Sequence, residues 1–376
     1  MQSTPSNRLH FIDFTRGLVM ILMAWDHVTL FWMQIHGGGE SPYIYITRNL
    51  ELSPTLFFSR FITHWCAPTF VFLSGVSLAL SVNNRLKRGD TQTEITIHII
   101  KRGIILLIIE ALLISPAFDF PRHYFGVLAT IGASLIILSL ARRLPTPIIL
   151  GASLITLLNH QFLNLDILSM DIAWSHYLRR ILYEPGLTWY PYFSLYPIIP
   201  WIAIMGLGWV LGTQLIKMDG TETQKLTVPF LLTGVLAISL FFIMRYLNGY
   251  GNLIPRWSNN ILDWLYISKY PPSIAFLLWT LGGTCIFMAA GILITNYDWT
   301  NKNILGAVYT FGRVPLFFYI THLWTYKLRL PQVEPPLFLN LAQTFALYIG
   351  GLLVLWLFSK RYMELKKGYP RFLQYI

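Results

Sequence analysis

The sequence predicts an all-α fold, a polytopic bundle of about ten transmembrane helices. Of its 376 residues, 55% are hydrophobic and only 12% are charged, about half the charge of an ordinary soluble domain. The apolar residues also come in long blocks, and a helix of about 20 apolar residues crosses a bilayer. The predicted spans are 11–33, 56–82, 95–116, 124–141, 146–163, 194–216, 227–247, 272–295, 303–327 and 337–359.

Two of these blocks carry the weakest signal. Blocks 124–141 and 146–163 are short, and Arg142, Arg143 and two prolines lie between or at the start of them. Eight or nine spans are therefore the alternative to ten. The first block is too long and too charged for a cleavable signal peptide, so we interpret it as a retained transmembrane helix.

The net charge of +11 is explained by topology. Much of the excess lies in short loops and in the C-terminal tail, as the positive-inside rule expects. On this assignment both termini are cytoplasmic, and the basic residues face membrane lipid rather than nucleic acid.

Nothing in the sequence indicates a second domain or a metal centre. No repeat or linker divides the chain, so residues 1–376 are predicted to form one membrane domain. The two cysteines, Cys66 and Cys285, lie inside apolar blocks and show no metal-ligand spacing. We therefore expect no metal.

The first block carries four ionisable residues: Asp13, Arg16, Asp26 and His27. A charged group costs roughly 2.5–3.5 kcal/mol at a membrane helix centre, so such residues are rarely kept without a partner or a task. Arg16 and His27 are eleven residues apart, which places them on nearly one face and about 16 Å apart along the axis. Asp13 and Arg16 are also close enough to neutralise each other.

Further polar residues fall at matching depths of later spans. Arg60 and His64 share a face of the second span. The ninth span places Arg313 towards the inner side of the membrane and His322 towards the outer side. The outer half thus collects three histidines and Asp26, whose carboxylate could orient a histidine base. We expect His27, His64, Asp26 and His322 to be catalytic, although single buried histidines are also common as packing groups.

Tryptophan and tyrosine cluster at the presumed outer ends of the spans. Interfacial belts explain most of them, and a sugar-stacking surface is the alternative. The longest loops are also on this side, at about 36–55, 164–193 and 248–271, and long loops often carry binding residues.

Five segments, spread over nearly the whole chain, carry a resemblance to a known family: residues 11–27, 62–75, 196–208, 269–273 and 311–322. They resemble the transmembrane acyltransferases related to the heparan-α-glucosaminide N-acetyltransferase catalytic domain, in particular their bacterial branch. The spacing of Arg16 and His27 is also similar to an Arg-x10-His pattern in membrane enzymes that O-acetylate surface glycans.

The resemblance implies a bacterial plasma-membrane enzyme that takes acyl-CoA, usually acetyl-CoA, from the cytoplasm. Its acceptor would be a glycan hydroxyl or amine on the outer side. Arg16 and Arg313 would then bind the CoA phosphates, and the histidines would deprotonate the acceptor. A ping-pong route through an acyl-imidazole ranks second.

The chain departs from the animal enzyme of this family, which has an amide where His27 stands and a histidine in the next outer segment, for which His36 is the nearest candidate. A transporter or a lipid- or glycan-binding protein without chemistry is the alternative function, although no inverted repeat supports a transporter. Whether the protein forms a homo-oligomer is left open by the sequence.

Overall fold

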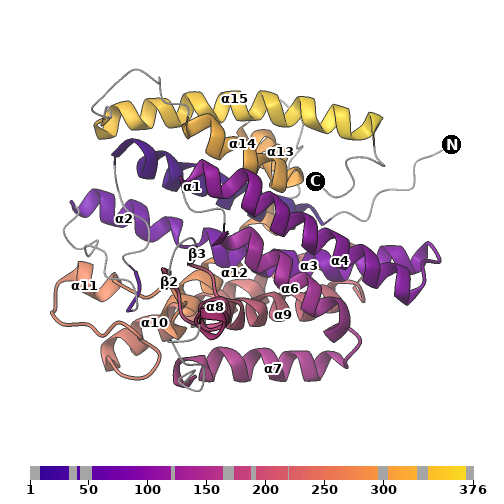
Figure 1. Cartoon of the computed structure of the whole chain (residues 1–376), viewed down its shortest axis with the longest axis horizontal. Coiled ribbons are helices and arrows are strands. Elements are labelled where there is room, and N and C mark those ends of the chain that lie inside the picture. Colours follow the sequence, from indigo (N-terminus) through magenta and orange to yellow (C-terminus); the bar gives the residue numbers. More distant parts are fainter. Residues whose placement is uncertain are drawn as a thin grey trace.

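The computed structural model describes residues 9–33, 40–42, 53–119, 123–163, 173–187, 192–218, 220–294, 304–327 and 338–369. Its long helices run roughly along the longest axis of the molecule, with α15 (Leu341–Gly368) along one edge and α7 (Thr146–Asn159) along the opposite edge (Figure 1). The other long helices lie between them. The predicted all-α class is confirmed.

The remaining helices, in chain order, are α1 (His10–Met33), α2 (Pro54–Thr63), α3 (Cys66–Lys87), α4 (Gln92–Ile109), α5 (Ser115–Ala117), α6 (Val127–Ala141), α8 (Ala173–Leu182), α9 (Ile198–Leu215), α10 (Thr227–Leu247), α11 (Ile261–Leu265), α12 (Ile274–Ile294), α13 (Ile304–Arg313) and α14 (Pro315–Lys327). A π-helical turn, Glu110–Ile114, joins α4 to α5. Short 3-10 turns occupy His160–Phe162 and Gly220–Leu226.

Six helical segments of the described chain are long and apolar enough to cross a membrane: His10–Met33, Pro54–Lys87, Ile198–Leu215, Glu222–Leu247, Ile274–Ile294 and Leu341–Gly368. The pair α13 and α14 would be a seventh, but it bends by 105°. The predicted number of ten spans is therefore not confirmed, although each predicted block overlaps a helix. The two weak blocks form α6 and α7, which are only 15 and 14 residues long.

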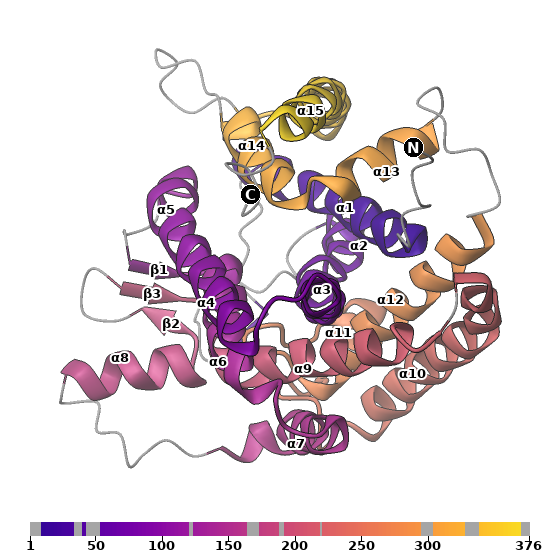
Figure 2. The ribbon, with the colours of Figure 1, turned by 90° about the vertical axis from the view of Figure 1, so that its right-hand side faces the viewer.

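The strands of the described chain form one small sheet beside the bundle. β3 (Tyr192–Ser194) lies between β1 (His123–Phe125), to which it is parallel, and β2 (Gly186–Leu187), to which it is antiparallel. Figure 2 shows this sheet between α8 and the group of α4, α5 and α6.

Glycines allow two helix pairs to approach closely. α3 lies near the centre of the end-on view (Figure 2) and packs against α9. A Cβ on Gly208 of α9 would sit 1.9 Å from the carbonyl oxygen of Phe72 in α3. Small residues at such contacts are typical of membrane helices, whose association depends on close packing.

The second close pair joins α1 to α13 at the Arg16 end of the bundle. A Cβ on Gly17 would lie 1.8 Å from the Val308 oxygen, and one on Gly312 would lie 1.8 Å from the Asp13 oxygen. The two backbones therefore touch through reciprocal glycines. This contact fixes α13, and the bend that follows it, against α1.

Proline explains the two breaks in the helices that carry candidate site residues. Pro68 has no N–H to donate to the carbonyl of His64, and the helix opens at His64 and Trp65 between α2 and α3. Pro315 likewise cannot continue α13, so the Val314 N–H turns back to the Phe311 oxygen at 3.1 Å and α14 starts in a new direction.

We predict that Gly312→Ala lowers the thermal stability of the protein. The added methyl group must push α1 away from α13, and overpacking of this kind costs about 1–3 kcal/mol. Thermal unfolding of the purified protein in detergent measures the effect. The matched control is Gly350→Ala in α15, where an added Cβ meets nothing within 4 Å and alanine favours the helix. Equal unfolding temperatures for the two variants would contradict the α1–α13 contact.

Candidate functional site

Two of the predicted histidines contact each other directly. His27, near the end of α1, and His322, in α14, are joined by a 2.7 Å hydrogen bond between His27 Nδ1 and His322 Nε2. Their ring planes are within 24° of parallel, and the ring centroids are 5.0 Å apart. His322 is fully buried, whereas His27 is partly buried and packs edge-on against Phe118.

The hydrogen bonds of this pair assign its protons. His322 Nδ1 lies 3.0 Å from the backbone oxygen of Phe318, and a carbonyl can only accept, so Nδ1 carries the hydrogen. In the neutral imidazole the Nε2 of His322 is then an acceptor, and the Nδ1 of His27 must be the donor to it. The lone pair of His27 consequently lies on Nε2, on the side of the ring away from His322.

A second group of polar side chains surrounds Arg60 of α2. Its Nη1 donates to both carboxylate oxygens of Asp26, at 2.5 and 2.6 Å, and its Nε donates to Glu40 at 3.0 Å. Asp26 also accepts from the hydroxyl of Thr63 at 2.7 Å. His64 Nε2 lies 3.4 Å from the same Glu40 oxygen. One guanidinium therefore bridges two carboxylates, and the second carboxylate reaches His64.

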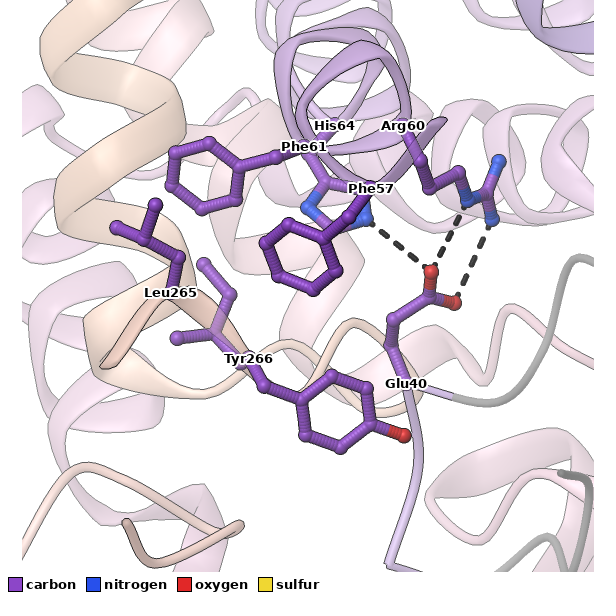
Figure 3. Close-up of a pocket in the computed structure, with 8 residues that line it drawn as sticks. Glu40, Phe57, Arg60, Phe61, His64, Leu265 and Tyr266 are labelled. Atoms are coloured by element: carbon purple, nitrogen blue, oxygen red, sulfur yellow. Dashed lines mark hydrogen bonds and ion pairs between the residues drawn. The ribbon is translucent and has the colours of Figure 1, made fainter. Parts of the chain in front are cut away.

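Figure 3 shows the part of this arrangement around Glu40, with Arg60 and His64 both pointing towards its carboxylate. The cavity beside them measures about 10 Å³, which is room for about one water molecule. Its lining residues are Glu40, Phe57, Arg60, Phe61, His64, Leu265, Tyr266 and Ile267.

Electrostatics keep Glu40 ionised in this buried position. Burial alone would raise its pKa, but Arg60 and the hydrogen bond with His64 hold the pKa of Glu40 well below its ordinary value. Since an ionised Glu40 only accepts, His64 Nε2 donates to it. His64 Nδ1 is buried and has no hydrogen-bond partner among the residues that the structure describes.

The two groups meet at α1, where Asp26 and His27 are neighbours. The sequence suggested that Asp26 orients a histidine, but its carboxylate is held by Arg60 and Thr63, and His322 makes the orienting hydrogen bond to His27. Among the described residues, His64 makes no hydrogen bond to the other two histidines. It is connected to them through Glu40, Arg60 and Asp26.

Sequence reasoning missed Glu40 and Lys269. Glu40 follows a run of three glycines between spans, and a carboxylate in such a position is expected to be an ordinary exposed loop residue. Lys269 precedes the eighth predicted block, where a lysine reads as a topological charge. Both are buried, with exposed fractions of 1% and 5%. The one sequence signal for Lys269 was the segment Lys-Tyr-Pro-Pro-Ser at 269–273, which resembles a segment of the acyltransferase family.

Arg16 and Arg313, the two arginines predicted to bind the CoA phosphates, lie near the other end of α1. Arg16 donates to Ser77 at 2.8 Å and to the Gly312 oxygen at 3.1 Å, and it lies 3.4 Å from Asp13. Arg313 is exposed at the bend after α13, with its guanidinium 5.5 Å from the Tyr309 ring centroid. Arg16 and Arg313 therefore share one region, because Arg16 binds the residue that precedes Arg313.

Two further histidines, His36 and His123, lie in loops between the predicted spans. His36 lies outside the described residues, and only the backbone of His123 is described, in β1. Within the described parts of the chain, no three His, Cys, Asp or Glu side chains are arranged to hold a metal ion.

Comparison with known proteins identifies the family. Residues 8–247 match the model of the family described as heparan-alpha-glucosaminide N-acetyltransferase, catalytic. The chain belongs to this family. With its apolar helices, it is an integral membrane protein of a transferase family.

One curated relative is the heparan-alpha-glucosaminide N-acetyltransferase of Mus musculus, which is 27% identical over 115 residues. The match covers 30% of this chain and 15% of the mouse protein. The family match includes Arg16, Asp26, His27, Arg60 and His64. It ends before Lys269, Arg313 and His322.

We predict that Arg60→Met strongly destabilises the protein. The variant leaves two buried carboxylates without their shared cation, and removing one partner of a buried ion pair costs about 3–5 kcal/mol. Thermal unfolding in detergent should show a large drop. The control is Arg361→Met, because Arg361 pairs with Glu364 at the surface, where an ion pair contributes little. If Arg60→Met unfolds at the temperature of Arg361→Met, the network does not hold α1 and α2 together.

Proposed function

We propose that the protein is a membrane acyltransferase that moves an acetyl group from acetyl-CoA to a glycan hydroxyl or amine. The observation that carries this proposal is the His27–His322 pair, which leaves one basic nitrogen in the bundle about 16 Å along α1 from Arg16. Family membership supports an acetyl donor. The Arg16 end would face the cytoplasm, and the His27 end would face the acceptor.

In this mechanism His27 Nε2 accepts the proton of the acceptor as its oxygen or nitrogen attacks the thioester carbonyl. His322 keeps the ring of His27 in the required tautomer through the Nδ1 hydrogen bond. Collapse of the tetrahedral intermediate re-forms the carbonyl and breaks the carbon–sulfur bond. The proton on His27 then returns to the departing thiolate, so that CoA leaves as the thiol.

The ping-pong variant uses the same lone pair as a nucleophile. His27 Nε2 would attack the thioester, release CoA and carry the acetyl group to the acceptor. Rapid mixing separates the two routes, because only the ping-pong route releases one equivalent of CoA in the absence of an acceptor.

The direct test uses purified protein in detergent, acetyl-CoA, and glucosamine or methyl glucoside as acceptor, each with and without an extract of membrane glycolipids. CoA thiol is measured with a thiol reagent. Acceptor-dependent CoA release supports the enzyme. No release above a protein-free control in any of these mixtures would overturn the proposal and favour a binding or transport protein.

We expect His27→Gln to lower kcat by roughly 10²–10⁴-fold, the usual contribution of a general acid–base group. Glutamine keeps the size and hydrogen-bonding capacity, so folding and donor affinity should be preserved. His322→Gln should lower kcat less, since it acts through His27. The control is His98→Gln. The His98 ring contacts Arg85 of α3, and its replacement should not affect turnover. Near-normal kcat in His27→Gln would remove His27 as the base.

Arg16→Ala and Arg313→Ala should each raise the KM for acetyl-CoA. A charge-assisted contact with a phosphate contributes roughly 1.5–3 kcal/mol, which corresponds to about tenfold or more. Steady-state kinetics at saturating acceptor measure it. Arg85→Ala is the matched control, because Arg85 pairs with Asp90 in the loop after α3. An unchanged KM in both variants would count against a donor site at this end.

A further inference from the structure

Lys269 is a buried cation near enough to the candidate base to interact with it electrostatically. It is 5% exposed, and its Nζ lies 5.1 Å from the centroid of the Tyr270 ring. It lies within electrostatic reach of Asp26, His27 and His64. Among the described residues it has no carboxylate within 4.0 Å. An ammonium is rarely buried without a partner, because leaving water is costly.

The backbone around Lys269 is fixed at several points. The N–H groups of Lys269 and Tyr270 both donate to the carbonyl of Glu40, at 2.8 and 3.1 Å. Ser268 Oγ donates to the Pro271 oxygen at 2.8 Å, and the Ser273 N–H donates to the Ser268 oxygen at 2.9 Å. The segment is therefore a short closed loop on top of α12. Such a loop fixes the backbone from which the buried Lys269 side chain extends.

The nearby carboxylates are already occupied. Asp26 binds Arg60 and Thr63, and Glu40 binds Arg60 and His64. Arg60 neutralises only one of the two negative charges on Asp26 and Glu40. Lys269 balances the other charge at a distance, without direct contact. Its ammonium therefore has no carboxylate as a direct partner among the described residues, and the proposed reaction creates a negative oxygen in the same electrostatic surroundings. Fixed donors in a buried site stabilise such a charge strongly, since they need no reorganisation.

We propose that Lys269 stabilises the oxyanion of acyl transfer, an inference that rests on the function proposed above. When the acceptor attacks the thioester carbon, the carbonyl π electrons move to the oxygen, and the Lys269 ammonium donates a hydrogen bond to it. When the carbon–sulfur bond breaks, the carbonyl re-forms and the hydrogen bond weakens. Lys269 keeps its proton throughout, so His27 alone transfers the acceptor proton.

The experiment compares Lys269→Met with the wild type, using acetyl-CoA and chloroacetyl-CoA as donors. Loss of one oxyanion donor typically lowers kcat by 10²–10³-fold, and we expect this for acetyl-CoA with little change in donor KM. The chlorine stabilises the oxyanion by itself, so the loss with chloroacetyl-CoA should be smaller. A structural role would lower kcat equally for both donors.

The control is Lys327→Met at the end of α14, where Lys327 pairs with Asp119 at 2.5 Å; its kcat should match the wild type. If Lys269→Met does not fold, Lys269→Arg carries the test. A counter-ion role predicts wild-type kcat for the arginine variant, whereas a donor aimed at one oxygen predicts a fall of tenfold or more.

The outcomes separate the two proposals. An active wild type with unchanged kcat in Lys269→Met, an equal loss for both donors, or wild-type kcat in Lys269→Arg overturns the oxyanion role and leaves the acyltransferase standing. A wild type that releases no CoA from acetyl-CoA overturns both.

Discussion

The bridge that Arg60 makes between Asp26 and Glu40 is the constraint on which the site depends. It joins α1 to α2 through Asp26 and brings the segment 40–42 into the bundle through Glu40. The carbonyl of Glu40 then receives the N–H groups of Lys269 and Tyr270, so the loop before α12 is placed by the same residue. Four segments of the chain are held together in this way, and the positions of His27, His64 and Lys269 follow from it. Such a network is costly to bury, and the hydrogen bonds that both carboxylates receive from Arg60, Thr63 and His64 offset part of that cost.

Broken helices bring the histidines to the site. A continuous α2–α3 helix would hydrogen-bond the His64 carbonyl to residue 68, and Pro68 prevents this. At Pro315 the chain turns by 105°, and only after that turn can His322 reach His27 while α13 stays against the first half of α1. The reciprocal glycines Gly17 and Gly312 hold α13 there. Irregular backbone within a membrane is tolerated where protein surrounds it, and here it sets the direction from which each histidine approaches.

The sequence predicted what depends on a single helix. The all-α class, the shared face of Arg16 and His27, and that of Arg60 and His64 all follow from helical periodicity. Both residues of the first pair do face the α13–α14 unit, and both residues of the second pair contact Glu40. The number of spans was less accessible, because α6 and α7 are short and a 105° bend has no periodic signature. The His27–His322 hydrogen bond joins residues 295 positions apart, and tertiary packing alone creates it. Glu40 and Lys269 lie in loops, where neither hydropathy nor periodicity distinguishes a buried charge from a surface one.

A histidine, and not a carboxylate, makes the hydrogen bond that orients His27. In a Ser-His-Asp triad, the carboxylate that orients the histidine also stabilises the imidazolium that forms during the reaction. In this protein the orienting group is neutral His322, and the carboxylate next to His27 is already bound to Arg60. A proton on His27 would therefore be stabilised mainly by the oxyanion created in the same step, together with Asp26 at a distance. Such a site favours a transition state in which proton transfer and attack on the carbonyl are coupled, because neither charge is stable there without the other. The ammonium proposed for Lys269 would stabilise that oxyanion, so the balance between stabilising the oxyanion and stabilising the imidazolium would be set by how closely Lys269 approaches the acyl oxygen.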